Sequence, residues 1–148
     1  MDEEFFLYYE EVALCHAAKQ AGWRVEFDPS VEVVHLRPLQ NRSISPKMRV
    51  ITRHSKLLYF RKHTPWPSFL LLSWGVTVEA KVRGIWSNWQ GQGEEARSWR
   101  AVGKIARELR RGSNLAGRKV LARADAVALP LRSAIERGSQ DAAQPDET

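Results

Sequence analysis

Two adjacent carboxylates, Glu10 and Glu11, follow an aromatic run at residues 5–9 and stand where the sequence predicts the start of a helix. A carboxylate at a helix start complements the positive end of the helix dipole. A partly desolvated carboxylate can also act as a general base, because burial raises its pKa toward neutral. The pair therefore has a structural and a catalytic interpretation, and the two residues by themselves favour the structural one.

His35 is the second candidate for chemistry, since an imidazole can ligate a metal or donate to a diphosphate. A surface histidine at the end of a strand is the alternative interpretation. The other three histidines, His16, His54 and His63, show no metal-ligand spacing with His35, and we interpret them as surface residues. Cys15 falls on the apolar stripe of the first predicted helix, and we interpret it as a core residue rather than a nucleophile.

The elements that must position these residues are predicted from pattern. The acidic pair opens a helix, and Gly22 is suited to end it in a left-handed turn. Residues 23–27 alternate apolar and polar side chains, which predicts a half-buried strand. Asp28 and Pro29 predict a turn, and residues 31–35 predict a second strand. The first 36 residues therefore indicate an α/β arrangement.

Three more helices are predicted beyond residue 47. One covers 48–63 and stops near Thr64-Pro65, and one covers 94–111 and is followed by Gly112. The stretch 66–89 is interrupted by Gly75 and Gly84, and its continuous apolar part is shorter than the ~20 residues of a membrane-spanning helix. It still carries an apolar stripe at helical spacing: Leu71, Trp74, Val78, Val82, Ile85 and Trp89. From about residue 138 the polar, acidic composition predicts disorder.

Charge is unevenly distributed along the chain. Residues 1–36 carry eight acids and two bases, whereas residues 37–123 carry nineteen bases and four acids. A basic middle favours an anionic partner, such as a membrane surface, a nucleic acid or a phosphorylated ligand. Five tryptophans between residues 66 and 99 alternate with Lys and Arg, which is typical of a segment in a membrane interface. The alternative is a pair of amphipathic helices that packs on another domain.

The order of residues near the start carries a family pattern. An acidic dipeptide precedes two phenylalanines, an aromatic run, an acidic pair at a helix start, an alanine-glycine-tryptophan helix end and a closing valine-valine-histidine. The matching positions are Asp2, Glu3, Phe5, Phe6, Leu7, Tyr8, Tyr9, Glu10, Glu11, Val12, Leu14, Cys15, Ala21, Gly22, Trp23, Val33, Val34 and His35. This pattern resembles the second half of the catalytic domain of bacterial family 2 glycosyltransferases, especially the rhamnosyltransferase-like branch. The helix at 54–63 extends the resemblance to about residue 63.

The resemblance implies a partial GT-A domain, a Rossmann-like α/β fold for nucleotide-diphospho-sugars, that lacks its N-terminal half and is followed by amphipathic helices. In that family the preceding half holds Mg or Mn through an Asp-x-Asp motif, and this chain contains no Asp-x-Asp. We therefore expect a truncated transferase that would pass a sugar to a glycan or lipid-linked acceptor and is inactive alone, with no metal bound by this chain itself. The family pattern also carries polar residues where this chain has Ala13 and Ala17.

The resemblance also implies roles for individual residues. Glu11 would be the general base and Glu10 would orient the helix start or the acceptor. His35 would contact the diphosphate, or the metal when the donor half is present. The acceptor-groove candidates, which would stack on sugar rings, are Tyr8, Tyr9 and Trp23. The following basic stretch offers phosphate-contact candidates, or else a solvated loop: Arg37 and Arg42, with Lys47, Arg49 and Arg53.

Three parts follow from these patterns. Residues 1–63 are the expected catalytic part, 64–111 the basic tryptophan-rich helical segment, and 112–148 a helical to disordered tail. The expected location is the cytoplasm, peripheral at the inner face of the cell membrane. A non-catalytic remnant that binds a membrane surface or a partner is the alternative function. A nucleic-acid partner is not expected, because no nucleic-acid motif accompanies the charge.

Overall fold

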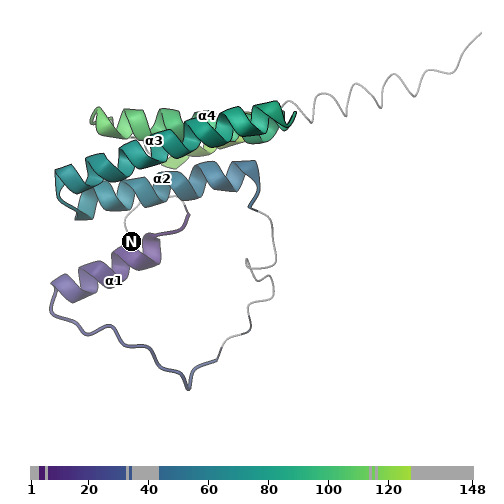
Figure 1. Ribbon diagram of the computed structural model, residues 1–148. Coiled ribbons are helices and arrows are strands. Elements are labelled where there is room, and N and C mark those ends of the chain that lie inside the picture. The colour runs from purple at the N-terminus through teal and green to yellow at the C-terminus, as the bar shows by residue number, and fades with distance from the viewer. Residues whose placement is uncertain are drawn as a thin grey trace, which may run out of the picture.

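The computed structural model describes residues 4–5, 7–32, 34, 44–113, 115 and 117–127. Four helices are α1 (Glu10–Gln20), α2 (Pro46–His63), α3 (Trp66–Trp89) and α4 (Gly93–Arg110). A further helical segment covers 117–127. In Figure 1, α2, α3 and α4 lie together as a bundle, and α1 lies apart on the α2 side.

The predicted α/β fold is wrong, because the part of the chain that the structure describes is helical and contains no strand. Residues 23–28 are extended but make no strand pairing, and both Trp23 and Phe27 are exposed. Alternating side chains indicate a strand only where a neighbouring strand can take the backbone hydrogen bonds. No described segment offers one, so the alternation at 23–27 forms no strand. Residues 33 and 35 of the second predicted strand lie outside the described residues.

The turn predicted between those segments is present. The backbone N–H and the hydroxyl of Ser30 both donate to a carboxylate oxygen of Asp28, at 2.9 and 2.7 Å. These bonds favour the ionised carboxylate, so they lower the pKa of Asp28. The Asp28 turn is therefore set by local chemistry and needs no sheet.

Helix boundaries follow from capping residues. Ser45 caps α2 by accepting a hydrogen bond from the Met48 N–H at 3.2 Å, and Pro46 occupies the first turn. The predicted glycine stops are confirmed, since Gly22 and Gly112 have φ of 84° and 82°. α3 continues through Gly75 and Gly84 without a break. These glycines lower helix propensity, but packing against α4 supplies the missing stability.

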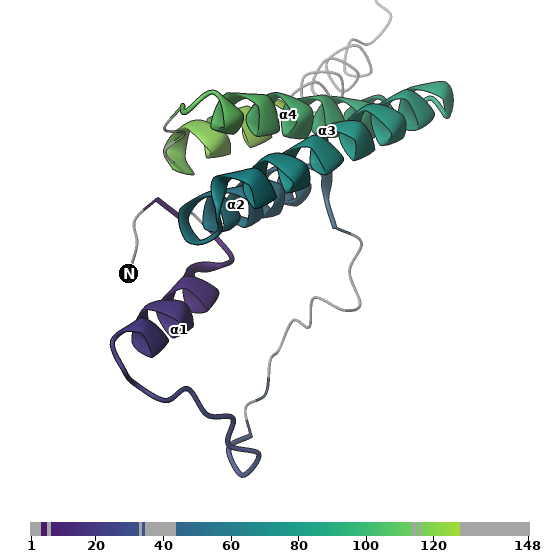
Figure 2. The same cartoon turned by 60° about the vertical axis from the view of Figure 1, so that its left-hand side comes forward.

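One core joins α2, α3, α4 and the segment 115–127. Its fully buried members include Val50, Phe69, Val102, Ile105 and Leu109. α3 and α4 share the largest interface, and α2 packs mainly on α4. Figure 2 shows the same three helices stacked, with the chain after α1 leading away from them. The core therefore crosses residues 63 and 111, where sequence composition changes.

α1 is attached through a second, smaller cluster. Ala13 is the buried residue of α1, and it packs with Phe5 and with Leu58 of α2. Cys15, predicted to be in the core, is exposed, and so is Leu14. Because α1 turns only one narrow edge toward α2, most of its apolar stripe faces solvent.

Candidate functional site

The head of α1 carries an unusual backbone. Tyr8 and Tyr9 have φ of 66° and 67°, in the left-handed region that bulky residues rarely adopt. The side chain of Tyr9 packs on Tyr59 of α2 with ring centroids 5.5 Å apart. Burial raises the pKa of Tyr9, although Arg53 opposes this shift. Such paired outliers persist where surrounding contacts fix them, and they concentrate at functional sites.

The acidic pair stands at the predicted helix start, because α1 begins at Glu10. The two carboxylates have different surroundings. Glu11 is exposed, whereas one carboxylate oxygen of Glu10 is buried and has no hydrogen-bond partner within the described residues. Of the two carboxylates, Glu10 is therefore the one less accessible to solvent in this structure.

Two histidines lie beside this head. The His16 ring of α1 lies 4.4 Å from the His63 ring of α2, and Tyr59 lies 4.8 Å from His63. The Nδ1 atom of His16 is buried without a hydrogen-bond partner within the described residues. Titratable and aromatic groups from α1 and α2 therefore meet in one place that the sequence analysis did not connect.

The other predicted site residues lie elsewhere. Trp23 follows the far end of α1, which at 1.5 Å per residue separates it from Tyr9 by roughly 16 Å. Trp23 is exposed beside Arg24 and Glu26. Tyr8 is half-buried at the head of α1. His35, Arg37 and Arg42 lie outside the described residues.

The remaining basic candidates are engaged in ion pairs. Arg49 donates to Glu95 and, at 2.8 Å, to the Ser98 hydroxyl, while Arg53 donates to Glu79 at 2.8 Å. Both guanidinium groups also lie over the ring of Trp99, at 4.8 and 5.6 Å from its centroid. Lys47 pairs with Asp125. These three cations hold α2 to its neighbours in this structure.

The outer face of α3 is the most apolar exposed surface of the bundle. The six residues of the predicted stripe, together with Trp86, are each between 57% and 77% exposed. We call these seven residues the α3 stripe: Leu71, Trp74, Val78, Val82, Ile85, Trp86 and Trp89. Contiguous apolar exposure of this kind marks an interaction surface.

The inner face of α3 is small and polar. It buries Ser73, Thr77, Ala80 and Ser87 beside Phe69 and Val76. The Arg110 guanidinium of α4 donates to the Ser73 carbonyl and hydroxyl, each at 2.9 Å, and to the Thr77 hydroxyl at 2.8 Å. Polar side chains thus share the buried face with Phe69 and Val76, and the seven residues of the α3 stripe face solvent.

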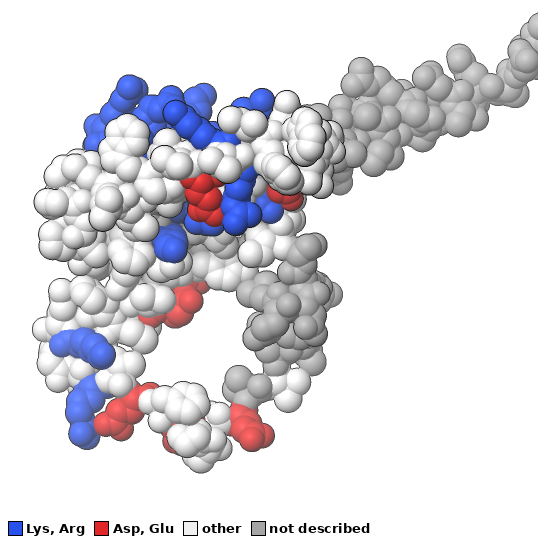
Figure 3. Space-filling model, in the orientation of Figure 1, with Lys and Arg blue, Asp and Glu red and all other residues white. Residues whose placement is uncertain are grey.

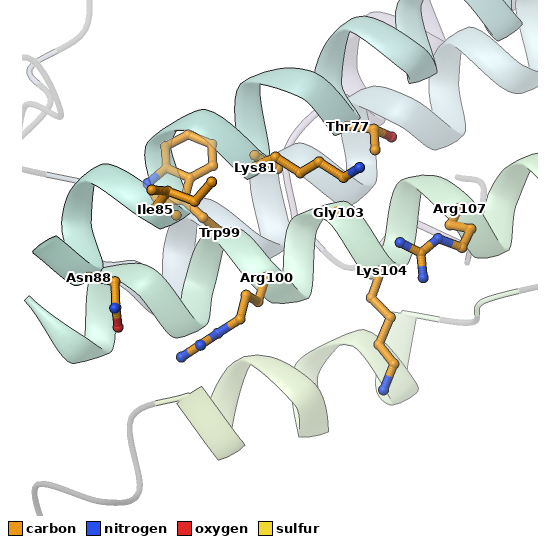
Figure 4. A pocket seen from close by; sticks show the side chains of 11 residues that line it. Thr77, Lys81, Ile85, Asn88, Trp99, Arg100, Gly103, Lys104 and Arg107 are labelled. Carbon is orange, nitrogen blue, oxygen red and sulfur yellow. The ribbon is translucent and has the colours of Figure 1, made fainter.

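A groove of about 580 Å³ runs between α3 and α4. Its floor includes small residues where the two helices approach closely: a Cβ on Gly84 would lie 3.5 Å from that of Trp99, and one on Gly103 would lie 3.5 Å from that of Ala80. Ile85 of the α3 stripe forms part of its wall, so the groove opens beside the stripe. Figure 4 shows this groove from close by.

Four cations line the groove: Lys81, Arg100, Lys104 and Arg107. Residues 44–127 contain seventeen Lys and Arg but five Asp and Glu, and four of these acids are already paired with cations elsewhere. Within the described residues, the side chains of the four groove cations make no ion pair or hydrogen bond. Figure 3 shows Lys and Arg gathered along one edge of the bundle, next to an uncharged face.

Sequence reasoning did not single out these four cations or His54. Residues 100, 104 and 107 recur at helical spacing, which was the available signal. His54, expected at the surface, is fully buried, and its Nε2 lies 3.0 Å from the Leu115 carbonyl. His54 lies on the buried side of α2, together with Val50, Ile51, Leu57 and Leu58.

Comparison with protein-family models, with curated proteins and with solved structures found no match to this chain. No helix within the described residues has the length and hydropathy needed to cross a membrane. The described residues also contain no group of three or more His, Cys, Asp and Glu arranged to hold a metal.

Proposed function

We propose that helices α2–α4 bind the surface of an anionic membrane, with the α3 stripe inserted in the interface. The observation that carries the proposal is the exposure of seven large apolar residues along one face of α3, each 57% or more exposed. Trp74, Trp86 and Trp89 are among them, and tryptophan prefers the level of the lipid headgroups.

Charge supports the same partner. The exposed edge of α4 beside the stripe carries Arg100, Lys104 and Arg107, which have no acidic partner within the described residues. Basic residues near an anionic leaflet each contribute about 1 kcal/mol of attraction, and this contribution falls with salt. A helix that lies in the interface combines this attraction with burial of its apolar face.

Vesicle sedimentation tests the proposal. We expect the full chain to sediment with phosphatidylglycerol vesicles at low salt, and less so at high salt or with phosphatidylcholine alone. Leu71→Gln with Val82→Gln should weaken binding at least about tenfold, because two inserted side chains are lost. The matched control is Val25→Gln with Phe27→Gln, which changes two exposed apolar residues outside the bundle. Equal binding by both double variants would contradict insertion of the stripe.

A second candidate function is the acceptor-side role in glycosyl transfer that the family 2 resemblance implies. The specific observation in its favour is a buried carboxylate oxygen of Glu10, which has no hydrogen-bond partner within the described residues and lies next to Tyr9 and Glu11 in the chain. In this role the chain would act with a donor-binding part that supplies the nucleotide sugar and Mg or Mn. The acceptor would be a glycan or a lipid-linked sugar, which accords with attachment at a membrane surface.

Fusion to the donor-binding half of a family 2 glycosyltransferase tests this role. Loss of a general base costs about a hundred- to ten-thousand-fold in rate, with donor binding little changed. The resemblance assigns the base to Glu11 and burial favours Glu10, so Glu11→Gln and Glu10→Gln are compared in the same fusion. Glu26→Gln, an exposed acid beyond α1, is the control. If both head variants behave like the control, the acidic pair serves only the helix start.

The chain without this fusion should not bind a sugar nucleotide. The motivation is the absence of an Asp-x-Asp motif from the sequence. Calorimetry with uridine and thymidine diphosphate sugars plus manganese measures this. Micromolar affinity for any of them would refute this expectation.

A further inference from the structure

We infer that the α3–α4 groove is a binding site for the phosphomonoester head group of a membrane lipid, whose acyl chains lie over the α3 stripe. The inference rests on the proposed membrane-surface function and names the lipid chemistry that this surface recognises. Its observations are the cations of the groove, which make no ion pair within the described residues, and the continuity between groove and stripe.

The groove presents donors from both helices. Lys81 comes from α3, and Arg100, Lys104 and Arg107 come from α4. In the view of Figure 4, Lys81 and Arg107 extend toward each other near Gly103, while the side chains of Arg100 and Lys104 point to the other side of α4. Arginine forks and a lysine ammonium are the side chains that bind phosphate oxygens most strongly.

The charge of the site favours a phosphomonoester over a phosphodiester. A phosphomonoester carries about −1.5 to −2 charge at neutral pH, with a second pKa near 6, and three acceptor oxygens. A phosphodiester carries a single negative charge. Lys81 and Arg107, which have no acidic partner within the described residues, therefore match the charge of a phosphomonoester better.

The rest of the groove favours a lipid over free phosphate. Ala80, Gly84 and Trp99 form an apolar floor, and Ile85 connects the groove with the exposed stripe. A volume of about 580 Å³ exceeds the space that one phosphate fills. A phosphate held by the cations would leave its glycerol and acyl carbons against Ile85 and the neighbouring stripe.

Vesicles of matched surface charge test the head-group preference. Full-length protein is mixed with phosphatidylcholine vesicles that contain phosphatidic acid, or enough phosphatidylglycerol to give the same charge. We expect about tenfold tighter binding to phosphatidic acid, since charge-assisted hydrogen bonds add to general attraction. Lys81→Gln with Arg107→Gln should abolish this preference, and it should weaken binding to phosphatidylglycerol only as much as the loss of two charges elsewhere on the bundle does. Arg118→Gln with Lys119→Gln removes the same charge from exposed positions outside the groove and should keep the preference.

A second measurement separates the groove from the membrane proposal. Short-chain phosphatidic acid, used as a monomer in solution, is titrated into the same three proteins and followed by NMR, with circular dichroism to confirm folding. Binding that the groove variant alone loses supports the site even if no vesicle is bound. Equal binding of inorganic phosphate and short-chain phosphatidic acid would overturn the lipid assignment. No binding of either, or equal loss in both variants, would overturn the site.

Discussion

α3 and α4 pack against each other along most of their length, yet they direct their apolar residues oppositely. α4 buries Trp99, Val102, Ile105 and Leu109 and exposes a cationic edge. α3 buries small and hydroxyl-bearing residues against α4 and exposes its largest apolar ones. α4 thus turns its apolar face to the core, whereas α3 leaves its apolar stripe exposed to solvent.

The contrast teaches how a close helix interface is made. Small residues at Gly84, Ala80 and Gly103 let the two backbones approach, and hydroxyl groups supply hydrogen bonds in place of apolar bulk. Large side chains on that face of α3 would force the helices apart. The α3 stripe therefore does not contribute to the core of the bundle. Substitutions in the buried face of α4 and in the α3 stripe should differ in their effect on stability.

The largest effect is expected from a matched isoleucine pair. Ile105→Ala in α4 should lower the free energy of unfolding by about 2–5 kcal/mol, because a fully buried side chain is removed and a cavity is left. Ile85→Ala in α3, where the side chain is 72% exposed, should change it by less than about 0.5 kcal/mol. Urea unfolding measures both. A comparable loss in the two variants would mean that the stripe is core after all.

A smaller effect is expected where the polar face of α3 meets α4. Arg110→Met keeps the apolar stem but removes the three hydrogen bonds to Ser73 and Thr77 and the contact of the guanidinium with the Trp74 ring at 4.3 Å. We expect a loss of about 1–2 kcal/mol in the free energy of unfolding. Arg111→Met, at an exposed neighbouring position, is the control and should be nearly neutral. Indistinguishable variants would show that Arg110 does not fasten the two helices.

The smallest effect on stability is expected from His54, a buried side chain with fewer hydrogen bonds than the buried Ser73. His54 has its Nδ1 unpartnered within the described residues, and burial lowers its pKa below the ordinary 6.5. As pH falls below 6.5, the unfolded chain binds a proton at this position before the folded chain does. The free energy of unfolding should therefore decrease as the pH is lowered through 6.5, and it should level off below the folded-state pKa of His54.

Unfolding of the protein and of His54→Gln, between about pH 8 and about pH 5, measures this dependence. We expect the decrease in stability to be smaller in the variant, since the other histidines are retained in both proteins. An identical pH dependence would show that His54 is not the group that titrates.

Sequence patterns predicted the positions of helices and turns better than they predicted which residues are buried. The helices at 48–63 and 94–111, the Asp28 turn and the stops at Gly22 and Gly112 depend on local capping and backbone preference, and they were found within a few residues. The stripe of α3 was found as a face, but periodicity cannot tell whether a face meets the core or solvent. The strand predicted at 23–27 is absent because strand formation depends on a partner elsewhere in the chain. His54 was missed because Leu115, its carbonyl partner, is distant in sequence.

For the candidate sites too, the position of a residue in its helix was predictable from the sequence, but its neighbours in other helices were not. The placement of the acidic pair at the head of α1 follows from the helix start, whereas the burial of Glu10 rather than Glu11 depends on how α1 leans on α2. The groove cations come from two helices, so their convergence requires the α3–α4 interface. Their spacing on α4 was visible, but Lys81 joins them only in three dimensions.

The unpaired segment at 23–28 has a consequence for the susceptibility of the chain to proteolysis. Trp23, Arg24 and Phe27 stand exposed on an unpaired backbone, which is the form a protease requires of its substrate. Trypsin-like and chymotrypsin-like enzymes should cut here first, well before any bond inside the long helices. Every fully buried member of the main core lies at or beyond Val50, so such a nick spares it. Residues 23–27 are thus the expected cleavage site for limited proteolysis that trims the chain to its bundle.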